Sequence, residues 1–157
     1  MARFTVTQQV RAPAATVWAA MVDWRRHGDW APLTAVRVTT SLPAGVGTEF
    51  VARTGIGWLA FDDPMTVEVW RPPGGDEQGD EPGRCEVVKR GRVVLGRAGF
   101  SAVPLHSGRC RVDWDEDVTV FPHRVTRLVG PLLSFAGRTG FGATLRAMAR
   151  EVEQKSR

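Results

Sequence analysis

A single carboxylate interrupts an apolar row in the last third of the sequence. The even-numbered residues of this stretch are Val112, Trp114, Glu116, Val118 and Val120, whereas the odd-numbered residues between them are polar or charged. Such alternation predicts a β-strand whose even-numbered face lies in the interior. Desolvation raises the pKa of a carboxylate on that face, and such a group can hold or transfer a proton. Glu116 is therefore a candidate catalytic residue.

Two structural explanations compete with a catalytic role for Glu116. A β-bulge near the end of the strand would turn the side chain to solvent, and a nearby arginine such as Arg53 would neutralise it as a buried pair. In a catalytic role, Glu116 would transfer a proton while Arg53, or another inward cation, polarised a substrate carbonyl. We keep Glu116 and Arg53 as candidate catalytic residues, with both structural explanations open.

The other reactive side chains form no recognised motif. Cys85 and Cys110 have neither CxxC spacing nor nearby histidines, which argues against a zinc site and for two buried thiols. The glycines of "GRTGFG" at 137–142 lack the preceding strand that a dinucleotide-binding turn requires. Predicted turns contain all three histidines, His27, His106 and His123. We expect no metal site and no cofactor.

Short strands dominate the middle of the sequence. Alternation predicts a first strand at Phe4–Val10 and then a helical pair that ends at Pro32. Six or seven further strands follow, at 35–40, 48–54, 57–61, 65–70, 84–89, 92–103 and 109–121. A last helix is expected from Gly130 to about Gln154. Because short turns join the strands, we expect one antiparallel sheet in a single domain over residues 1–157.

Matching of apolar positions predicts how the last strands pair. The expected neighbours are Phe100 with Trp114, Ala98 with Glu116, and Gly96 with Val118, with Arg97 near Asp117 on the outer face. The small residues beside Glu116 would leave it facing open space. The same register sets Cys85 level with Gly96, roughly 27 Å from Cys110 at strand rise. A disulfide between the two cysteines is excluded at that separation.

The last helix has an uneven inner face. At steps of about 100° from Phe141, its sheet-facing stripe is bulky in the C-terminal half and nearly bare in the N-terminal half. The bulky residues are Leu145, Met148 and Val152, and the bare positions are Gly130, Ser134 and Gly137. We therefore predict a cavity beneath the bare half, lined by Trp30, Phe50, Phe61, Met65, Phe100, Trp114, Ser134, Phe135, Gly137 and Phe141. The alternative is that tryptophan side chains fill this volume.

Four stretches occur in an order that resembles a known superfamily. They are "VRAPAATVWAAMVDWRRHGDW", "FDDPMTVEVWRPP", "GRVVLGRAGFSAVPLHSGRCRVDWDEDV" and "GPLLSFAGRTGFGATLRAMAREVE". Together they resemble the SRPBCC or START-like helix-grip superfamily, particularly its polyketide cyclase/dehydrase branch. The resemblance implies an α+β helix-grip fold: a seven-stranded antiparallel sheet wrapped around a long C-terminal helix, with two short helices after the first strand. It also implies a deep hydrophobic cavity between sheet and helix.

Charge and hydropathy limit the classes of partner. The formal charge is +4, and since Lys89 and Lys155 are the only lysines, 19 of the 21 basic residues are arginine. The arginines are scattered among carboxylates instead of clustering in one stretch, so we expect no nucleic-acid binding. No window reaches eighteen consecutive apolar residues, so we expect no stable membrane insertion and a cytoplasmic protein, either monomer or homodimer.

Three functions fit these observations. The leading hypothesis is binding of a hydrophobic or aromatic small molecule, such as a polyketide or a lipid, in the predicted cavity. The second is an enzyme of the cyclase/dehydratase type that uses the inward carboxylate. The third is a protein-interaction module, for which a filled interior and an exposed apolar patch would be the signature.

Overall fold

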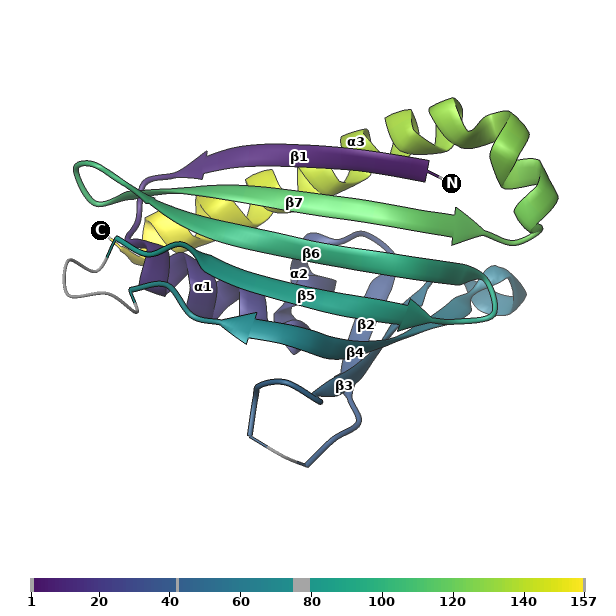
Figure 1. The fold of residues 1–157 in the computed structure, drawn as a ribbon, viewed down its shortest axis with the longest axis horizontal. Coiled ribbons are helices and arrows are strands. Elements are labelled where there is room, and N and C mark those ends of the chain that lie inside the picture. Colours follow the sequence, from purple (N-terminus) through teal and green to yellow (C-terminus); the bar gives the residue numbers. More distant parts are fainter. Residues whose placement is uncertain (1, 42, 75–79, 157) are drawn as a thin grey trace.

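In the part of the chain that the structure describes, seven antiparallel strands form one sheet that packs against a long helix and two shorter ones (Figure 1). The computed structural model describes residues 2–41, 43–74 and 80–156, with the backbone alone for 123–129. The sheet has the order β1-β7-β6-β5-β4-β3-β2. Its strands are β1 (Ala2–Val10), β2 (Thr34–Val38), β3 (Glu49–Thr54), β4 (Phe61–Arg71), β5 (Gly83–Arg90), β6 (Val94–Leu105) and β7 (Arg109–Val120).

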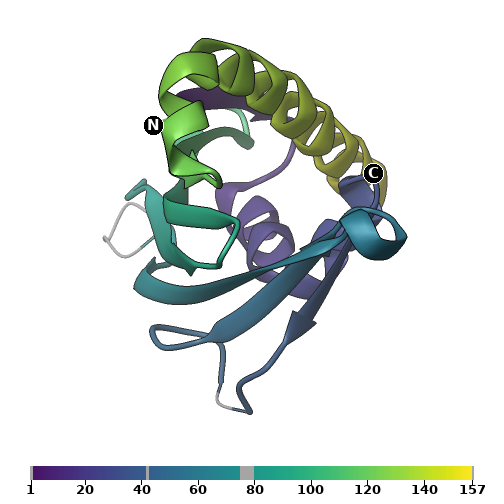
Figure 2. The same cartoon turned by 90° about the vertical axis from the view of Figure 1, so that its right-hand side faces the viewer.

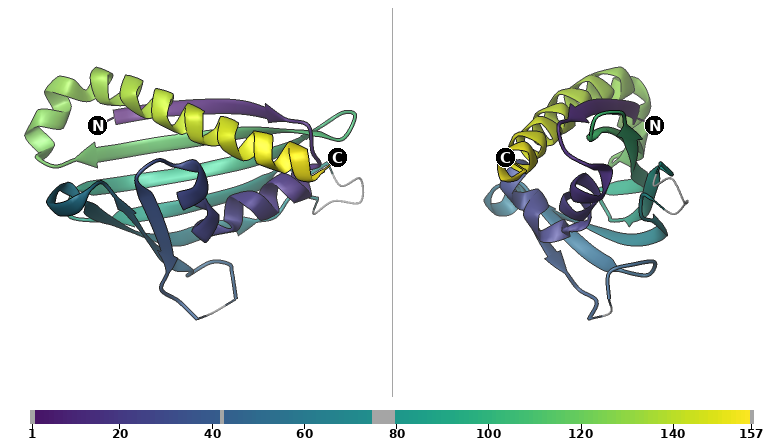
Figure 3. Two further views of the ribbon diagram at one scale, coloured as in Figure 1. Left: turned by 180° about the vertical axis from the view of Figure 1, so that it is seen from behind. Right: turned by 90° about the vertical axis from the view of Figure 1, so that its left-hand side faces the viewer.

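The helices lie on the concave side of the curled sheet (Figure 2). They are α1 (Ala14–Val22), α2 (His27–Trp30) and α3 (His123–Lys155), with the 3-10 turns η1 (Trp24–Arg26) and η2 (Gly57–Leu59). Seen from behind, α3 crosses the sheet, and α1 and α2 lie beside its C-terminal half (Figure 3). Glu151 of α3 holds this contact, because it accepts a hydrogen bond of 2.6 Å from Trp30 Nε1 and pairs with Arg26. The predicted α+β helix-grip fold is confirmed.

The boundaries of two predicted elements are wrong. Residues 57–61 do not form a strand: η2 occupies Gly57–Leu59, and β4 begins at Phe61. The last helix begins at His123 instead of Gly130, and Pro131 lies inside it. Its first turns run at an angle to the rest (Figure 1), as expected where a proline removes a backbone hydrogen bond. Among the described residues, no helix is both long and apolar enough to cross a membrane.

The predicted pairing of β6 with β7 is confirmed in every position. Gly96 lies opposite Val118, Ala98 opposite Glu116 and Phe100 opposite Trp114. The register of β5 is wrong by four residues, because Cys85 lies opposite Phe100 instead of level with Gly96. An even shift keeps the same residues on the inner face, so alternation alone does not detect it. At strand rise Cys85 is still about 13 Å from Cys110, and both buried thiols are free.

Candidate functional site

Three charged side chains are buried together on the inner face of the sheet. Lys89 is 8% exposed, Asp63 6% and Glu116 2%. Lys89 Nζ donates a hydrogen bond of 2.8 Å to Asp63 Oδ2 and lies 3.8 Å from Glu116 Oε2. We call these residues the buried ionic cluster. Strand alternation predicted the inward position of Glu116, whereas Lys89 and Asp63 were not among the predicted site residues.

Strand alternation explains how the buried ionic cluster assembles. On β5, Gly83, Cys85, Val87 and Lys89 are the buried positions, so Lys89 continues an apolar row. On β4, Asp63 precedes the buried Met65 and Val67 in the same way. Gly96 of β6 lies opposite Lys89, and Ala98 lies between Val87 and Glu116 across the sheet. The small side chain of Ala98 leaves the inner face open beside the longer side chain of Glu116.

Burial and neighbouring charges have opposite effects on the pKa values of Glu116 and Lys89. Desolvation raises the pKa of Glu116, although Lys89 and a hydrogen bond from Trp114 work against the shift. Burial alone would lower the pKa of Lys89, but the charges of Glu116 and Asp63 outweigh it and raise that pKa. One cation therefore faces two carboxyl groups. This arrangement can hold a proton at Glu116 and keep a positive charge on Lys89.

Three buried polar atoms have no hydrogen-bond partner among the described residues: Asp63 Oδ1 and Trp24 Nε1 in the interior, and Asp117 Oδ1 on the outer face of the sheet. Asp63 Oδ1 is one, although Oδ2 of the same carboxylate is bound to Lys89. Trp24 Nε1 is another, on a ring that stacks on Phe50 with centroids 4.2 Å apart. Buried polar groups are nearly always paired, and an unpaired one costs about 1–3 kcal/mol. The interior therefore offers one free acceptor and one free donor.

Aromatic rings surround the cluster on the side of Glu116. Trp114 Nε1 donates to Glu116 Oε1 at 3.1 Å. The Trp114 ring in turn lies 5.3 Å from Phe141 of α3 and 6.2 Å from Phe100, centroid to centroid. Of the predicted lining residues, Trp30, Phe50, Met65 and Phe100 are buried, whereas Phe61, Trp114, Ser134 and Phe141 are half-buried. Most of the predicted lining therefore lies in or at the edge of the interior.

Three predicted site residues are misplaced. Arg53 is exposed and pairs with Asp62 at 3.2 Å, so Lys89 is the inward cation near Glu116. Phe135 is 69% exposed and does not line the interior. Gly137 faces the ring of Phe4 from β1, and a Cβ there would overlap that ring. The space beside Gly137 is therefore occupied by Phe4 instead of being open to a ligand.

His27 also differs from its prediction as an exposed turn residue. It lies in α2, half-buried, with its Nε2 2.7 Å from the carbonyl oxygen of Met21. Its ring packs near Trp24, Trp30 and Trp114, with centroids 5.4, 5.6 and 6.0 Å away. Burial lowers the pKa of His27, which favours the neutral imidazole. These contacts give His27 a packing role between the helices and the sheet.

Replacing Gly137 tests the contact with Phe4. We expect Gly137→Ala to destabilise the fold by about 1–2 kcal/mol, because overpacking costs more than the helix gains from alanine. Shortening the ring in Gly137→Ala/Phe4→Leu should recover part of that loss, measured by urea denaturation of both variants and of Phe4→Leu alone. If Gly137→Ala were as stable as the wild type, the ring would not be confined at that position.

The described part of the surface has two hollows and an apolar patch that the sequence did not predict. The hollows have volumes of about 430 and 300 Å3, and neither is lined by the predicted cavity residues. The cavity beneath α3 therefore stays a prediction. Around η2, four apolar side chains are exposed by 62–90%: Leu33, Ile56, Trp58 and Leu59.

Similarity to known proteins is detected at the level of structure. No protein-family model and no curated protein sequence matches the chain. The aromatase/cyclase Zhui from Streptomyces sp. R1128 is 17% identical, with a TM-score of 0.68 over 99% of this chain and 95% of that one. A START superfamily protein from Mycobacterium smegmatis is 18% identical, with a TM-score of 0.69 over 97% of each chain.

A third similar structure contains bound aromatic molecules. Norcoclaurine synthase from Thalictrum flavum, in complex with dopamine and hydroxybenzaldehyde, is 16% identical, with a TM-score of 0.64 over 97% of this chain and 86% of that one. Identities this low establish a shared fold and nothing about the reaction. The chain has the helix-grip fold of the START-like, or SRPBCC, proteins.

Proposed function

We propose that this protein binds a hydrophobic or aromatic small molecule on the concave side of its sheet, with a polar group of the ligand at the buried ionic cluster. The observation that carries the proposal is the burial of Lys89, Asp63 and Glu116 on the inner face of the sheet, where Glu116 accepts a hydrogen bond from Trp114. Taking an ion out of water costs several kcal/mol, and apolar replacements of buried ion pairs are often more stable. A cluster retained at such a cost is a functional-site candidate.

The chemistry of the free atoms narrows the kind of ligand. Asp63 Oδ1 can accept a hydrogen bond, and the cluster holds two carboxyl groups for one ammonium. A hydroxyl or an ammonium group of the ligand would donate to that oxygen. The structural neighbour that holds dopamine and hydroxybenzaldehyde carries aromatic molecules with such groups. A phenolic or amine-bearing aromatic ligand therefore fits best.

Binding of matched probes tests the proposal. Calorimetric titration with 2-naphthol and with naphthalene should show tighter binding of the hydroxylated probe. Asp63→Leu should weaken the binding of 2-naphthol by about tenfold, or about 1.4 kcal/mol, and leave the affinity for naphthalene unchanged. Arg53→Met, which removes an exposed charge, is the matched control and should bind both probes normally. The proposal would be contradicted if neither probe bound, or if Asp63→Leu bound 2-naphthol as tightly as the wild type does.

A cyclase or dehydratase activity is the second candidate, and the neighbouring aromatase/cyclase supports it. The raised pKa of Glu116 suits a group that holds and transfers a proton, and Lys89 would polarise a substrate carbonyl in the role first predicted for Arg53. Turnover of a polyketide-like substrate that persisted in Glu116→Gln would remove Glu116 from the mechanism.

The apolar patch around η2 is the observation that favours the third hypothesis, a protein-interaction module.

A further inference from the structure

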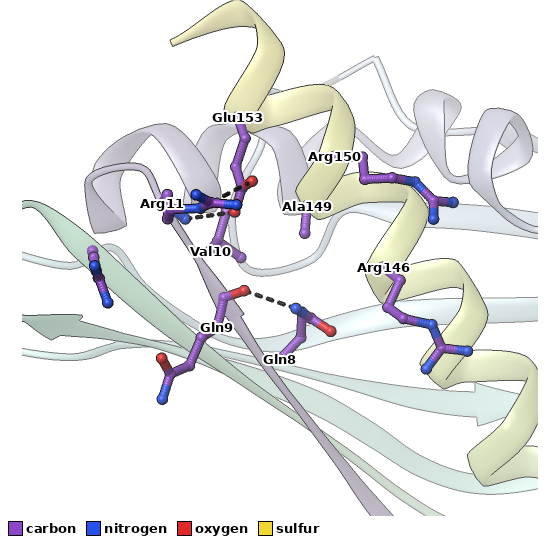
Figure 4. A pocket seen from close by; sticks show the side chains of 9 residues that line it. Gln8, Gln9, Val10, Arg11, Arg146, Ala149, Arg150 and Glu153 are labelled. Atoms are coloured by element: carbon purple, nitrogen blue, oxygen red, sulfur yellow. Dashed lines mark hydrogen bonds and ion pairs between the residues drawn. The ribbon is translucent and has the colours of Figure 1, made fainter. Parts of the chain in front are cut away.

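A hollow of about 430 Å3 lies between the edge strand β1 and the C-terminal half of α3 (Figure 4). Four arginines line it: Arg11, Arg109, Arg146 and Arg150. The other lining residues are Gln8, Gln9, Val10, Ala149 and Glu153. We call this hollow the arginine groove. It shares no residue with the buried ionic cluster, so an inference about it is independent of the proposed function.

Positive charge in the arginine groove is poorly compensated. Glu153 is the one acidic residue in the lining, and Arg11 engages it through its backbone N–H at 2.9 Å and its guanidinium at 3.5 Å. Among the described residues, Arg109, Arg146 and Arg150 have no carboxylate within ion-pair distance. Four guanidinium groups and one carboxylate leave a formal charge of +3 in one hollow.

The outer face of the sheet provides the contrast. There, Arg84 pairs with Glu86 and Asp115, and Arg97 pairs with Glu68. Arginine is common throughout this sequence, so the number of arginines alone carries no weight. What distinguishes the arginine groove is that three arginines without a carboxylate partner line the same hollow. Like charges held close together repel one another, and a bound anion would relieve that repulsion.

The fold positions these arginines from three distant segments. Arg146 and Arg150 are four residues apart on α3 and project from the same side of the helix (Figure 4). Gly142, one turn earlier, leaves room for the guanidinium of Arg146, whose Nη1 would lie 3.3 Å from a Cβ at that position. A larger residue at 142 would push against this arginine. The absence of a side chain at position 142 therefore leaves space for the guanidinium of Arg146 next to β1.

We propose that the arginine groove binds a small molecule that carries two or more phosphate or carboxylate groups. Guanidinium groups bind both oxyanions through paired N–H donors, which gives geometry as well as charge. The volume suits a small organic ligand more than a single inorganic ion. The side-chain amide of Gln8 supplies a further donor, although one of its N–H groups is used by the carbonyl oxygen of Gln9.

Calorimetric titration with inorganic triphosphate and with citrate tests this site and separates the two oxyanions. We expect at least one of them to bind in 50 mM NaCl, and to bind more weakly in 300 mM NaCl because salt screens exposed charges. Preference for triphosphate would assign phosphate chemistry to the ligand, and preference for citrate would assign carboxylate chemistry. Comparable binding of both would support a site for multivalent anions of either kind.

Charge-matched variants identify the groove as the location. The double variant Arg146→Gln/Arg150→Gln should bind the anion at least 30-fold more weakly than the wild type. Arg25→Gln/Arg138→Gln removes the same charge from exposed positions outside the groove and should change affinity by less than threefold. Equal losses in the two variants, or no binding of either anion at millimolar concentration, would overturn the site. Binding of a DNA oligonucleotide without binding of triphosphate or citrate would overturn the assignment to a small molecule.

Discussion

Replacing Lys89 with methionine is expected to destabilise the protein by about 3–5 kcal/mol at neutral pH. The substitution keeps the apolar stem of the side chain but removes the ammonium group that faces Asp63 and Glu116. Two carboxyl groups would then share the interior without a cation. Urea denaturation at pH 7 measures the effect. Arg53→Met, which removes an exposed arginine paired with Asp62, is the control and should change the free energy of unfolding by less than about 0.5 kcal/mol.

The pH dependence of this effect has a definite sign. Desolvation already raises the folded-state pKa of Glu116, and loss of Lys89 raises it further. An acid whose folded pKa lies above its unfolded pKa lowers stability at high pH, and protonation removes that penalty as pH falls. Lys89→Met should therefore regain stability relative to wild type between about pH 7 and pH 4.

The wild type should lose stability in alkali. The folded pKa of Lys89 is raised, so its stabilising contribution is complete below the unfolded value of about 10.4 and is lost as pH rises through the folded value. Replacing Lys89, Asp63 and Glu116 together with Met, Leu and Leu should recover most of the stability lost in the single variant. A Lys89→Met protein as stable as Arg53→Met at pH 7 would contradict a charged, desolvated cluster.

Gly96→Ala is expected to be the second most damaging change, at about 3 kcal/mol. Gly96 has φ = +141°, a backbone conformation that side chains disfavour. A Cβ there would overlap the carbonyl oxygen of Asp117 and approach the Cα of Val118 to 2.9 Å. Because both are backbone atoms of the paired strand β7, they cannot move aside without disturbing the sheet.

Gly140→Ala is the matched control for this substitution. Gly140 lies in α3, where a Cβ would meet no atom within 4 Å. Alanine there should therefore stabilise the helix by about 1 kcal/mol. Thermal and urea unfolding of the two variants should move in opposite directions. If Gly96→Ala were as stable as Gly140→Ala, the β6–β7 pairing would tolerate a side chain at position 96.

The predicted destabilisation at Gly96 is connected to the site. This glycine lies opposite Lys89 in the pairing of β5 with β6. A substitution at position 96 that disturbs the pairing with β7 therefore acts next to the buried ionic cluster.

Local alternation was enough to predict the sheet-facing residues of the last two strands. The even-numbered face of β7 lies inward, Glu116 lies on it, and the β6–β7 register agrees with the structure. These predictions succeed because the side-chain period of a strand is two residues, and a short turn joins the two strands. The order of short helices, strands and long helix predicted an antiparallel sheet with a final helix, and the resemblance to the START-like superfamily implied the helix-grip fold.

Alternation failed where charged residues lie at strand ends. Lys89 follows Val88 at the end of a predicted strand, and Asp63 lies before the first residue predicted for its strand, so both resembled surface positions. Their inner-face parity with Val87 and Met65 was the available signal. That signal was insufficient because burial of a charge depends on the partner that another strand provides. Arg53 was predicted as the inward cation in place of Lys89, because local periodicity does not show which of the two is exposed.

The sequence by itself determined which faces are apolar, how β6 pairs with β7, and the fold class, because these follow from periods of two and 3.6 residues along the chain. The tertiary structure alone decided that Lys89 and Asp63 join Glu116, that Phe4 occupies the space beside Gly137, and that arginines from three segments share one groove. Each of these is a contact between residues far apart in the chain. Such contacts depend on strand register, sheet curvature and helix placement, which local periodicity does not specify.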